Sequence, residues 1–191
     1  MQKKISELVS DYDQKGWTIY KNLFLENEIF QVGKIIDNFL NKKINEDIKK
    51  TRSINFVNEG TKDIKNINSF HELAQCNEIK TLANGKKILE LAKAFLKSEP
   101  EFRFCELFAK PPKIGLPSPD HQDNFYWGVR GSNALTIWVA LDKATKDNGC
   151  LYYYDGSHKY GILNHTASYA KGSSQKIANI DFLKKFKIFK C

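Results

Sequence analysis

The chain has 191 residues, of which 41% are hydrophobic, and it carries a formal net charge of +8. This length fits a single domain over residues 1–191. No apolar run approaches the roughly 18 to 20 residues that cross a bilayer, so no membrane partner is expected. The chain starts without the apolar core of a secretory signal, and its four cysteines have no zinc-binding spacing. These features predict a cytoplasmic protein with free thiols.

Residues 1–100 are expected to form a mainly helical support. Apolar residues recur at intervals of three and four positions, which is typical of amphipathic helices. The predicted helices are, in chain order, residues 5–15, 26–41 and 88–96. Gly16 ends the first helix, and Pro100 follows the end of the third. The polar stretch 41–68 between them predicts a loop with one short strand at 53–57.

After Pro100 the hydrophobic pattern changes to a period of two, which predicts strands. Residues 135–141 are apolar or small at nearly every position, so they predict a strand buried on both faces. Further strands are predicted at 102–110, 150–154 and 182–190. Helices followed by strands indicate the α+β class.

The positive charge would suit a nucleic-acid partner, but the lysines are spread along the whole chain. Basic and aromatic residues alternate closely only in the segment 182–190. Nucleic acid is therefore not the expected partner.

The segment DHQDNFYW, residues 120–127, places His121 and Asp123 two positions apart. In an extended segment, residues i and i+2 point to the same side, so the imidazole and the carboxylate can reach one point. Such a pair supplies two of the three protein ligands in the 2-His-1-carboxylate sites that hold Fe(II). The alternative is a surface histidine with an aspartate as its hydrogen-bond partner.

Three longer segments resemble the phytanoyl-CoA dioxygenase family of Fe(II)- and 2-oxoglutarate-dependent oxygenases. They are KPPKIGLPSPDHQDNFYW (110–127), NALTIWVALDKATKDNGCL (133–151) and GSHKYGILNH (156–165). The opening GWTIYKNLF (16–24) is also similar to that family, whereas the stretch 41–68 matches it weakly.

The resemblance implies a double-stranded β-helix, which is a jelly-roll or cupin-like barrel, with the N-terminal helices packed outside it. Residues 101–191 would form the first part of this barrel and leave it incomplete at its C-terminal side. The resemblance also implies Fe(II) bound by His121 and Asp123, 2-oxoglutarate as co-substrate, O2 as oxidant and a small organic molecule as substrate.

Other site residues follow from the same resemblance. Trp138 corresponds to a tryptophan near the 2-oxoglutarate pocket, and Thr136 lies on the same strand face as a second cofactor-binding candidate. Phe125 is expected to face the iron and line the substrate pocket, because alternation would turn Gln122, Asn124 and Tyr126 away. Plain core packing is the alternative for both Trp138 and Phe125.

The family pattern also requires a distal histidine and a later arginine that pairs with the far carboxylate of 2-oxoglutarate. After Asp123 the chain has only His158 and His165, and no arginine follows either. His165 is the better candidate for a third ligand. His71 is expected to be a surface or capping residue. Lys110 is a further candidate for the substrate pocket, with snorkelling to solvent as the alternative.

Two functions are consistent with these residues. The first is an Fe(II)/2-oxoglutarate dioxygenase that hydroxylates a small molecule, present here in a truncated form without the distal histidine and the arginine. The alternative is a catalytically inactive jelly-roll binding module. The sequence does not identify the substrate.

Overall fold

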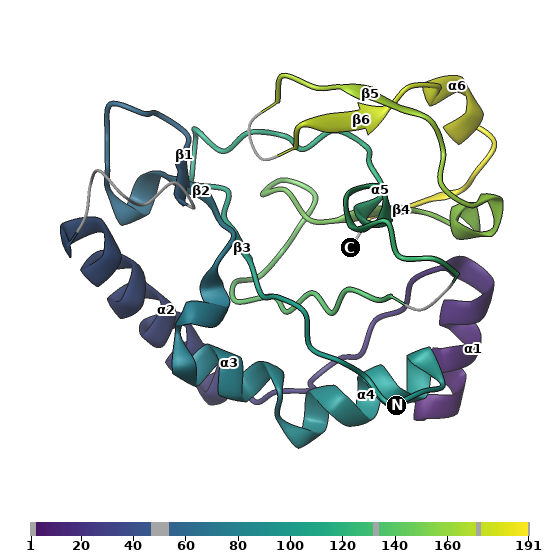
Figure 1. Cartoon of the computed structure of the whole chain (residues 1–191), viewed down its shortest axis with the longest axis horizontal. Helices are drawn as coiled ribbons and strands as arrows, with labels where there is room; N and C mark the ends of the chain where they lie inside the picture. The colour runs from purple at the N-terminus through teal and green to yellow at the C-terminus, as the bar shows by residue number, and fades with distance from the viewer. Residues whose placement is uncertain (1–2, 47–53, 132–133, 171–172, 191) are drawn as a thin grey trace.

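The structure is a computed structural model that describes residues 3–46, 54–131, 134–170 and 173–190. The N-terminal helices lie along one side of the molecule, and the strands lie on the other side (Figure 1). Within the described ranges, no helix is long and apolar enough to cross a membrane. Residues 47–53 of the loop predicted over 41–68 lie outside the described ranges, and the short strand predicted at 53–57 is present as Ile54–Phe56.

The three predicted helices are confirmed, two of them with one shifted end, and one further helix is added to the helical support. The main helices are α1 (Ile5–Lys15), α2 (Glu26–Glu46), α3 (Asn77–Ala83) and α4 (Lys86–Leu96). Helix α2 extends five residues beyond the predicted end, and α4 starts two residues earlier than predicted. The sequence did not predict α3, because seven residues are too short for a clear helical period.

The strands form three small antiparallel sheets. The first joins β1 (Ile54–Phe56), β2 (Ile67–Phe70) and β3 (Leu107–Phe108). The second pairs β4 (Tyr152–Tyr154) with β7 (Ile188–Lys190), and the third pairs β5 (His165–Ala167) with β6 (Gln175–Ile177). Helices and strands together agree with the α+β class. A closed barrel does not form among the described residues, so the double-stranded β-helix stays a prediction.

Short helical turns connect these sheets. They are the 3-10 turns η1 (Ile64–Asn66), η2 (Leu73–Gln75) and η3 (Ser157–Tyr160) and the short helices α5 (Asp123–Trp127) and α6 (Ile180–Leu183). Helix α6 interrupts the strand predicted over 182–190, because the Asn179 side chain accepts the Phe182 N–H and caps a helical turn there. Only β7 remains of that predicted strand.

Two predicted strands are mostly absent. Residues 134–141 form no ladder with any described strand, and only β3 remains of the strand predicted over 102–110. The alternation of side chains nevertheless persists. Leu135, Ile137, Val139 and Leu141 are half-buried, whereas Thr136, Trp138 and Ala140 are exposed. The prediction that both faces are buried is therefore wrong, because no second layer covers the Trp138 face among the described residues.

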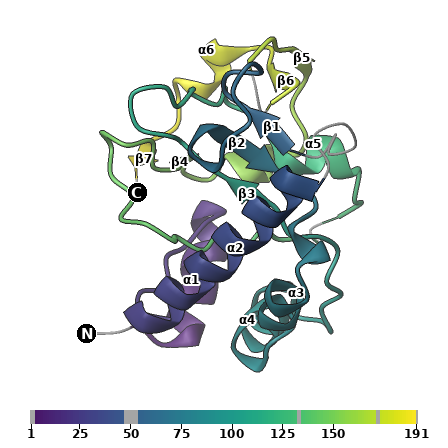
Figure 2. The ribbon, with the colours of Figure 1, turned by 90° about the vertical axis from the view of Figure 1, so that its left-hand side faces the viewer.

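The main core lies between α2 and the first sheet, and one end of α2 lies beside this sheet in Figure 2. Ile36, Leu40 and Ile44 recur along one face of α2 and are buried. They pack with residues of β1 and β2, among which Phe70 has no exposed surface and lies 6.0 Å from the Phe39 ring. Burial of each such side chain contributes about 1.5–3 kcal/mol, so this contact is the main anchor of the helical support.

Gly16 ends α1 and also lets α1 contact a distant turn. Its φ of 84° is left-handed, and its N–H donates to the Tyr12 carbonyl. The His158 ring packs so closely that an added Cβ at Gly16 would lie 2.5 Å from His158 Nδ1. The Gly156 N–H donates to the Lys15 carbonyl nearby. Position 16 therefore requires glycine for two separate reasons.

The next residue, Trp17, completes this junction. Its indole N–H donates to Asp155 Oδ1 over 2.7 Å. Its ring stacks on Phe189 of β7 with centroids 4.0 Å apart, and on Tyr153 of β4 at 5.8 Å. The segment that follows α1 is thus packed against the second sheet.

His71, directly after β2, links the three strand segments of the first sheet through its side chain. Its Nδ1–H donates to Glu106 Oε1 over 2.8 Å, while Nε2 lies 2.9 Å from Asn55 Nδ2 and 3.2 Å from Ser69 Oγ. Its ring edge faces Phe108. The His71 side chain is 39% exposed, as expected for a surface residue, but it also links neighbouring segments through these hydrogen bonds. The hydrogen bond to Glu106 raises the pKa of His71 above its usual value.

Replacing Gly16 with alanine should destabilise the fold. The left-handed φ costs about 1–2 kcal/mol for a residue with a Cβ, and the His158 ring must also move. Gly33→Ala is the matched control, because Gly33 lies within α2 and an added Cβ there would have nothing within 4 Å. This control should gain about 0.5–1 kcal/mol. Urea unfolding measures both, and equal stabilities would contradict the role of Gly16.

The His71–Glu106 contact should make stability depend on pH. Because the pKa of His71 is raised in the folded state, the stabilisation is complete below the ordinary histidine pKa of about 6.5. It is lost as the pH rises through the raised value. The difference in unfolding free energy between the parent and His71→Gln should therefore shrink with rising pH. A difference that stays constant from pH 5.5 to pH 8.5 (about one unit below to two above the ordinary value) would exclude this linkage.

Candidate metal centre

His121 and Asp123 point to the same place, as the sequence predicts. Gln122 between them is extended, with φ −122° and ψ 123°, so their side chains fall on one side. His121 Nε2 lies 3.4 Å from Asp123 Oδ1. Two ligands at right angles on a metal, each about 2.1 Å from it, are about 3 Å apart. The observed separation is thus close to that of a metal-bound pair.

The protein fixes which histidine nitrogen faces the aspartate. His121 Nδ1–H donates to the Pro119 carbonyl over 2.8 Å, which leaves Nε2 on the side of Asp123. A metal-binding histidine commonly donates its other N–H to a carbonyl in this way. The hydrogen bond with Asp123 raises the pKa of His121, and the pKa of Asp123 is lowered by His121 first and by Thr136 second.

Thr136 orients the carboxylate. Its hydroxyl donates to Asp123 Oδ2 over 2.8 Å, so Oδ1 is the oxygen that remains beside His121. The sequence predicted Thr136 as a cofactor-binding residue. The structure places it in direct contact with Asp123. The segment 134–141 therefore contributes to the centre although it belongs to no sheet.

The alternation predicted beyond Asp123 is wrong, because α5 starts at Asp123. Tyr126 does not turn away: its ring edge faces His121 with centroids 6.2 Å apart, and its hydroxyl lies 3.2 Å from Ser173 Oγ. Phe125 stacks on the His165 ring, with centroids 4.1 Å apart. The rings of Phe125 and Tyr126 therefore both lie near the His121–Asp123 pair.

Gln122 holds the segment 161–165 against the centre. Its side-chain amide donates to the Gly161 carbonyl, and its side-chain oxygen accepts the Leu163 N–H over 2.7 Å. Its own N–H donates to His165 Nε2 over 3.2 Å. No local pattern in the sequence indicates this role, because the partners lie about forty residues away.

Both ring nitrogens of His165 are in use. Nε2 accepts the Gln122 N–H, and Nδ1–H donates to the Leu163 carbonyl over 2.8 Å. His165 therefore lies next to the pair but supports the backbone. Among the described residues, no group of three histidine, cysteine or acidic side chains is placed to hold one ion.

The remaining predicted site residues lie as follows. Trp138 and Phe125 are 44% and 39% exposed, so neither is part of the buried core. Lys110 is partly desolvated, which lowers its pKa, and its ammonium donates to the Leu116 carbonyl. The aliphatic part of Lys110 lies where a Cβ at Gly149 would fall. Lys110 therefore connects the segment around Leu116 with the turn at Gly149.

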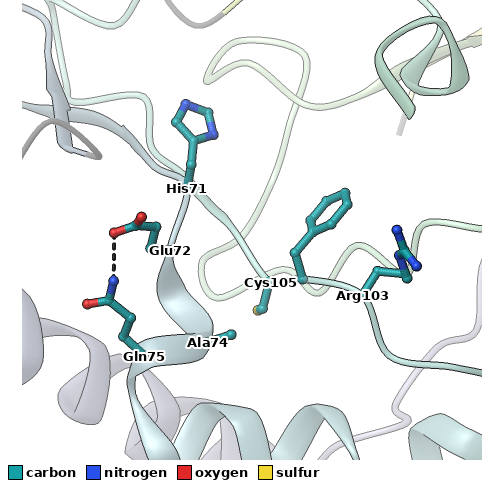
Figure 3. Close-up of a pocket in the computed structure, with 7 residues that line it drawn as sticks. His71, Glu72, Ala74, Gln75, Arg103 and Cys105 are labelled. Carbon is teal, nitrogen blue, oxygen red and sulfur yellow. Dashed lines mark hydrogen bonds between the residues drawn. The ribbon is translucent and has the colours of Figure 1, made fainter. Parts of the chain in front are cut away.

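A separate shallow pocket lies beside η2. Its lining residues are His71, Glu72, Ala74, Gln75, Arg103, Phe104 and Cys105 (Figure 3). Glu72 accepts a hydrogen bond from Gln75, as drawn in the figure. Burial raises the pKa of the Cys105 thiol, which disfavours the reactive thiolate. The pocket is therefore a weaker candidate for a reactive site than the His121–Asp123 pair.

Comparison with known proteins gives one family. A sequence model of the family described as Phytanoyl-CoA dioxygenase (PhyH) matches residues 12–181. Phytanoyl-CoA dioxygenase 1 of rice, Oryza sativa subsp. japonica, is 26% identical over 168 residues, covering 85% of this chain and 57% of the rice protein. The peroxisomal phytanoyl-CoA dioxygenase of cattle, Bos taurus, is 26% identical over 165 residues, covering 81% of this chain and 48% of the cattle protein.

A nematode relative matches a shorter segment more strongly. The phytanoyl-CoA dioxygenase domain-containing protein 1 homolog of Caenorhabditis briggsae is 36% identical over 81 residues, covering 42% of this chain and 28% of the nematode protein. The chain thus spans between about a quarter and somewhat more than half of these relatives.

Removing the Thr136 hydroxyl should weaken metal binding. Thr136→Val keeps the shape but leaves Asp123 Oδ2 without its donor, whereas Thr136→Ser keeps the donor. Loss of such a supporting hydrogen bond typically lowers metal affinity about 10- to 100-fold. Calorimetric titration with Co(II), a stable substitute for Fe(II), measures this. Equal affinities for Thr136→Val and Thr136→Ser would show that the hydroxyl does not support a metal ligand.

Proposed function

Because the chain belongs to the phytanoyl-CoA dioxygenase (PhyH) family, we propose that it carries the Fe(II)-binding part of a 2-oxoglutarate-dependent dioxygenase that hydroxylates a small organic molecule. The observation that carries this proposal is the arrangement of His121 and Asp123. One nitrogen and one oxygen lie 3.4 Å apart, and each side chain is oriented by a second hydrogen bond.

The residues around the pair have separate tasks in this proposal. His121 Nε2 and Asp123 Oδ1 would hold the metal, while Pro119 and Thr136 keep the other atoms of these side chains occupied. Fe(II), together with 2-oxoglutarate and O2, supplies oxidising power that no protein side chain has. A metal bound by few protein ligands keeps positions open for such co-substrates.

The exposed face of residues 134–140 is the surface that we assign to 2-oxoglutarate. Thr136 lies on this face and contacts Asp123, so the face adjoins the pair directly. Trp138 is two positions further along the same face and is open to solvent. Phe125 and Lys110 stay candidates for the substrate pocket.

His165 is the third-ligand candidate within this chain, and it would have to change partner. Its Nε2 must release the Gln122 N–H before it could bind a metal, while Nδ1–H can keep its bond to Leu163. Without that change, His121 and Asp123 are the two ligands that this chain supplies. A site with only these two ligands would agree with a binding module that lacks turnover.

The compartment of this activity remains a prediction. The sequence predicts the cytoplasm, whereas the cattle relative is named peroxisomal. The activity and substrate of this relative belong to a longer protein than this chain.

An anaerobic titration with Fe(II) and 2-oxoglutarate tests the proposal. Chelation of the metal by 2-oxoglutarate should produce a visible charge-transfer band, which requires no turnover. His121→Ala and Asp123→Ala should each abolish the band, because each removes one of the two ligands. The matched control is His158→Ala, which removes a histidine that packs on α1.

His165→Gln separates the two versions of the site. A band that survives this substitution shows that His165 supports the backbone, whereas its loss identifies His165 as a ligand. If the parent chain gives no band and binds no Fe(II), the dioxygenase proposal is wrong for this chain.

A further inference from the structure

Three aromatic rings meet on the surface far along the chain from the metal pair. They belong to Tyr160 at the end of η3, Phe182 in α6 and Phe186 just after α6. Tyr160 lies 5.4 Å from both Phe182 and Phe186 between ring centroids, and the two phenylalanine rings are 5.5 Å apart. All three pairs are edge-to-face, which is a favourable arrangement for aromatic rings. We refer to these three rings as the aromatic cage.

The aromatic cage already surrounds a cation. The ammonium of Lys185 lies 3.6 Å from the Phe182 ring centroid, 3.9 Å from that of Tyr160 and 5.1 Å from that of Phe186. A cation within about 6 Å of a ring centroid is attracted by the negative face of the ring. Three such contacts converge on one nitrogen, so the cage has the geometry of a cation-binding site.

The fold holds the cage in place from two distant segments. Leu183 is 2% exposed and anchors α6, while Phe182 and Phe186 on either side of it remain partly exposed. The Phe182 N–H donates to Asn179 Oδ1, and the Phe186 N–H donates to the Leu183 carbonyl. Tyr160 comes from the turn that packs on α1. The cage is therefore a tertiary feature, and not only a consequence of sequence neighbours.

We propose that the aromatic cage is a binding site for a quaternary ammonium group and that Lys185 occupies it in the absence of such a ligand. A primary ammonium is strongly hydrated, so it gains little from leaving water. A quaternary ammonium is bulkier, has no N–H to hydrate and is the cation that aromatic cages recognise best. Tyr160 is 55% exposed, so a ligand can reach the cage from solvent.

One of the charges beside the cage is already paired with an opposite charge. Lys184, the neighbour of Lys185, is paired with Asp181 at 2.6 Å, which reduces its repulsion of a second cation. The four-carbon side chain of Lys185 can swing out into solvent when it leaves the cage. Its ammonium would then be close enough to pair with an anionic group on the same ligand. This proposal does not rest on the iron site, and its readouts are separate.

The test uses tetramethylammonium, which is the binding group alone. Its methyl protons should shift upfield in NMR spectra when they lie over aromatic rings. Lys185→Gln removes the competing cation, so we expect it to bind about two- to fivefold more tightly than the parent, which is the equilibrium equivalent of about 0.5–1 kcal/mol for one exposed cation–π contact. Lys184→Gln is the matched control and should bind like the parent.

Variants of the rings decide whether the cage is the site. Tyr160→Phe keeps the ring and should bind, whereas Tyr160→Leu and Phe186→Leu should each lose the upfield shift. Circular dichroism checks that each variant folds, and the two leucine variants serve as independent versions of the same test. Absence of any shift in Lys185→Gln, or its persistence in a folded leucine variant, would overturn the proposal.

Two further probes identify the source of the group. Phosphocholine represents a free metabolite, and phosphatidylcholine vesicles represent a membrane. Sedimentation with vesicles that depends on Tyr160 would assign the cage to lipid head groups. Binding of phosphocholine without sedimentation would assign it to a small molecule.

Discussion

The candidate centre depends on the conformation and the hydrogen bonds of Gln122. Gln122 must be extended so that His121 and Asp123 fall on one side, and it must also hold the segment 161–165 with three hydrogen bonds. Its extended backbone serves the first purpose, and its backbone N–H and side chain serve the second. The same residue therefore sets both the geometry of the pair and the position of His165. A helix begins directly after it, so the extended conformation is limited to this point of the chain.

Local patterns in the sequence predicted the features that depend on nearby residues. The ends of α1 and α4 follow from Gly16 and from the residues before Pro100, because each depends on the conformation of one residue and its neighbours. The approach of His121 to Asp123 likewise needs only one extended residue between them. The pairing of β4 with β7 and the bond from Trp17 to Asp155 were not predictable, since neither partner carries a local signal for the other.

The segment 134–141 shows why a correct pattern can give a wrong strand. Its apolar alternation is real, and the odd-numbered side chains are half-buried as expected for one packed face. A strand also needs hydrogen-bonding neighbours, which no pattern within the segment can supply. The exposed side retains Trp138 and also Thr136, which contacts Asp123. A face that looks like a core from its composition is therefore an open surface beside the candidate centre.

The stacking of Trp17 on Phe189 also has a consequence for how the chain folds during its synthesis. These two residues are separated by most of the chain, and β7 must exist before Trp17 can take its final position. Helix α1 can pack on α4 early, since the Tyr12 and Phe95 rings are in contact, whereas the Phe189 partner of Trp17 is made much later. Contacts of such wide sequence separation slow folding, because a long loop must close first. Trp17 must therefore remain without its Phe189 partner until translation has passed residue 189.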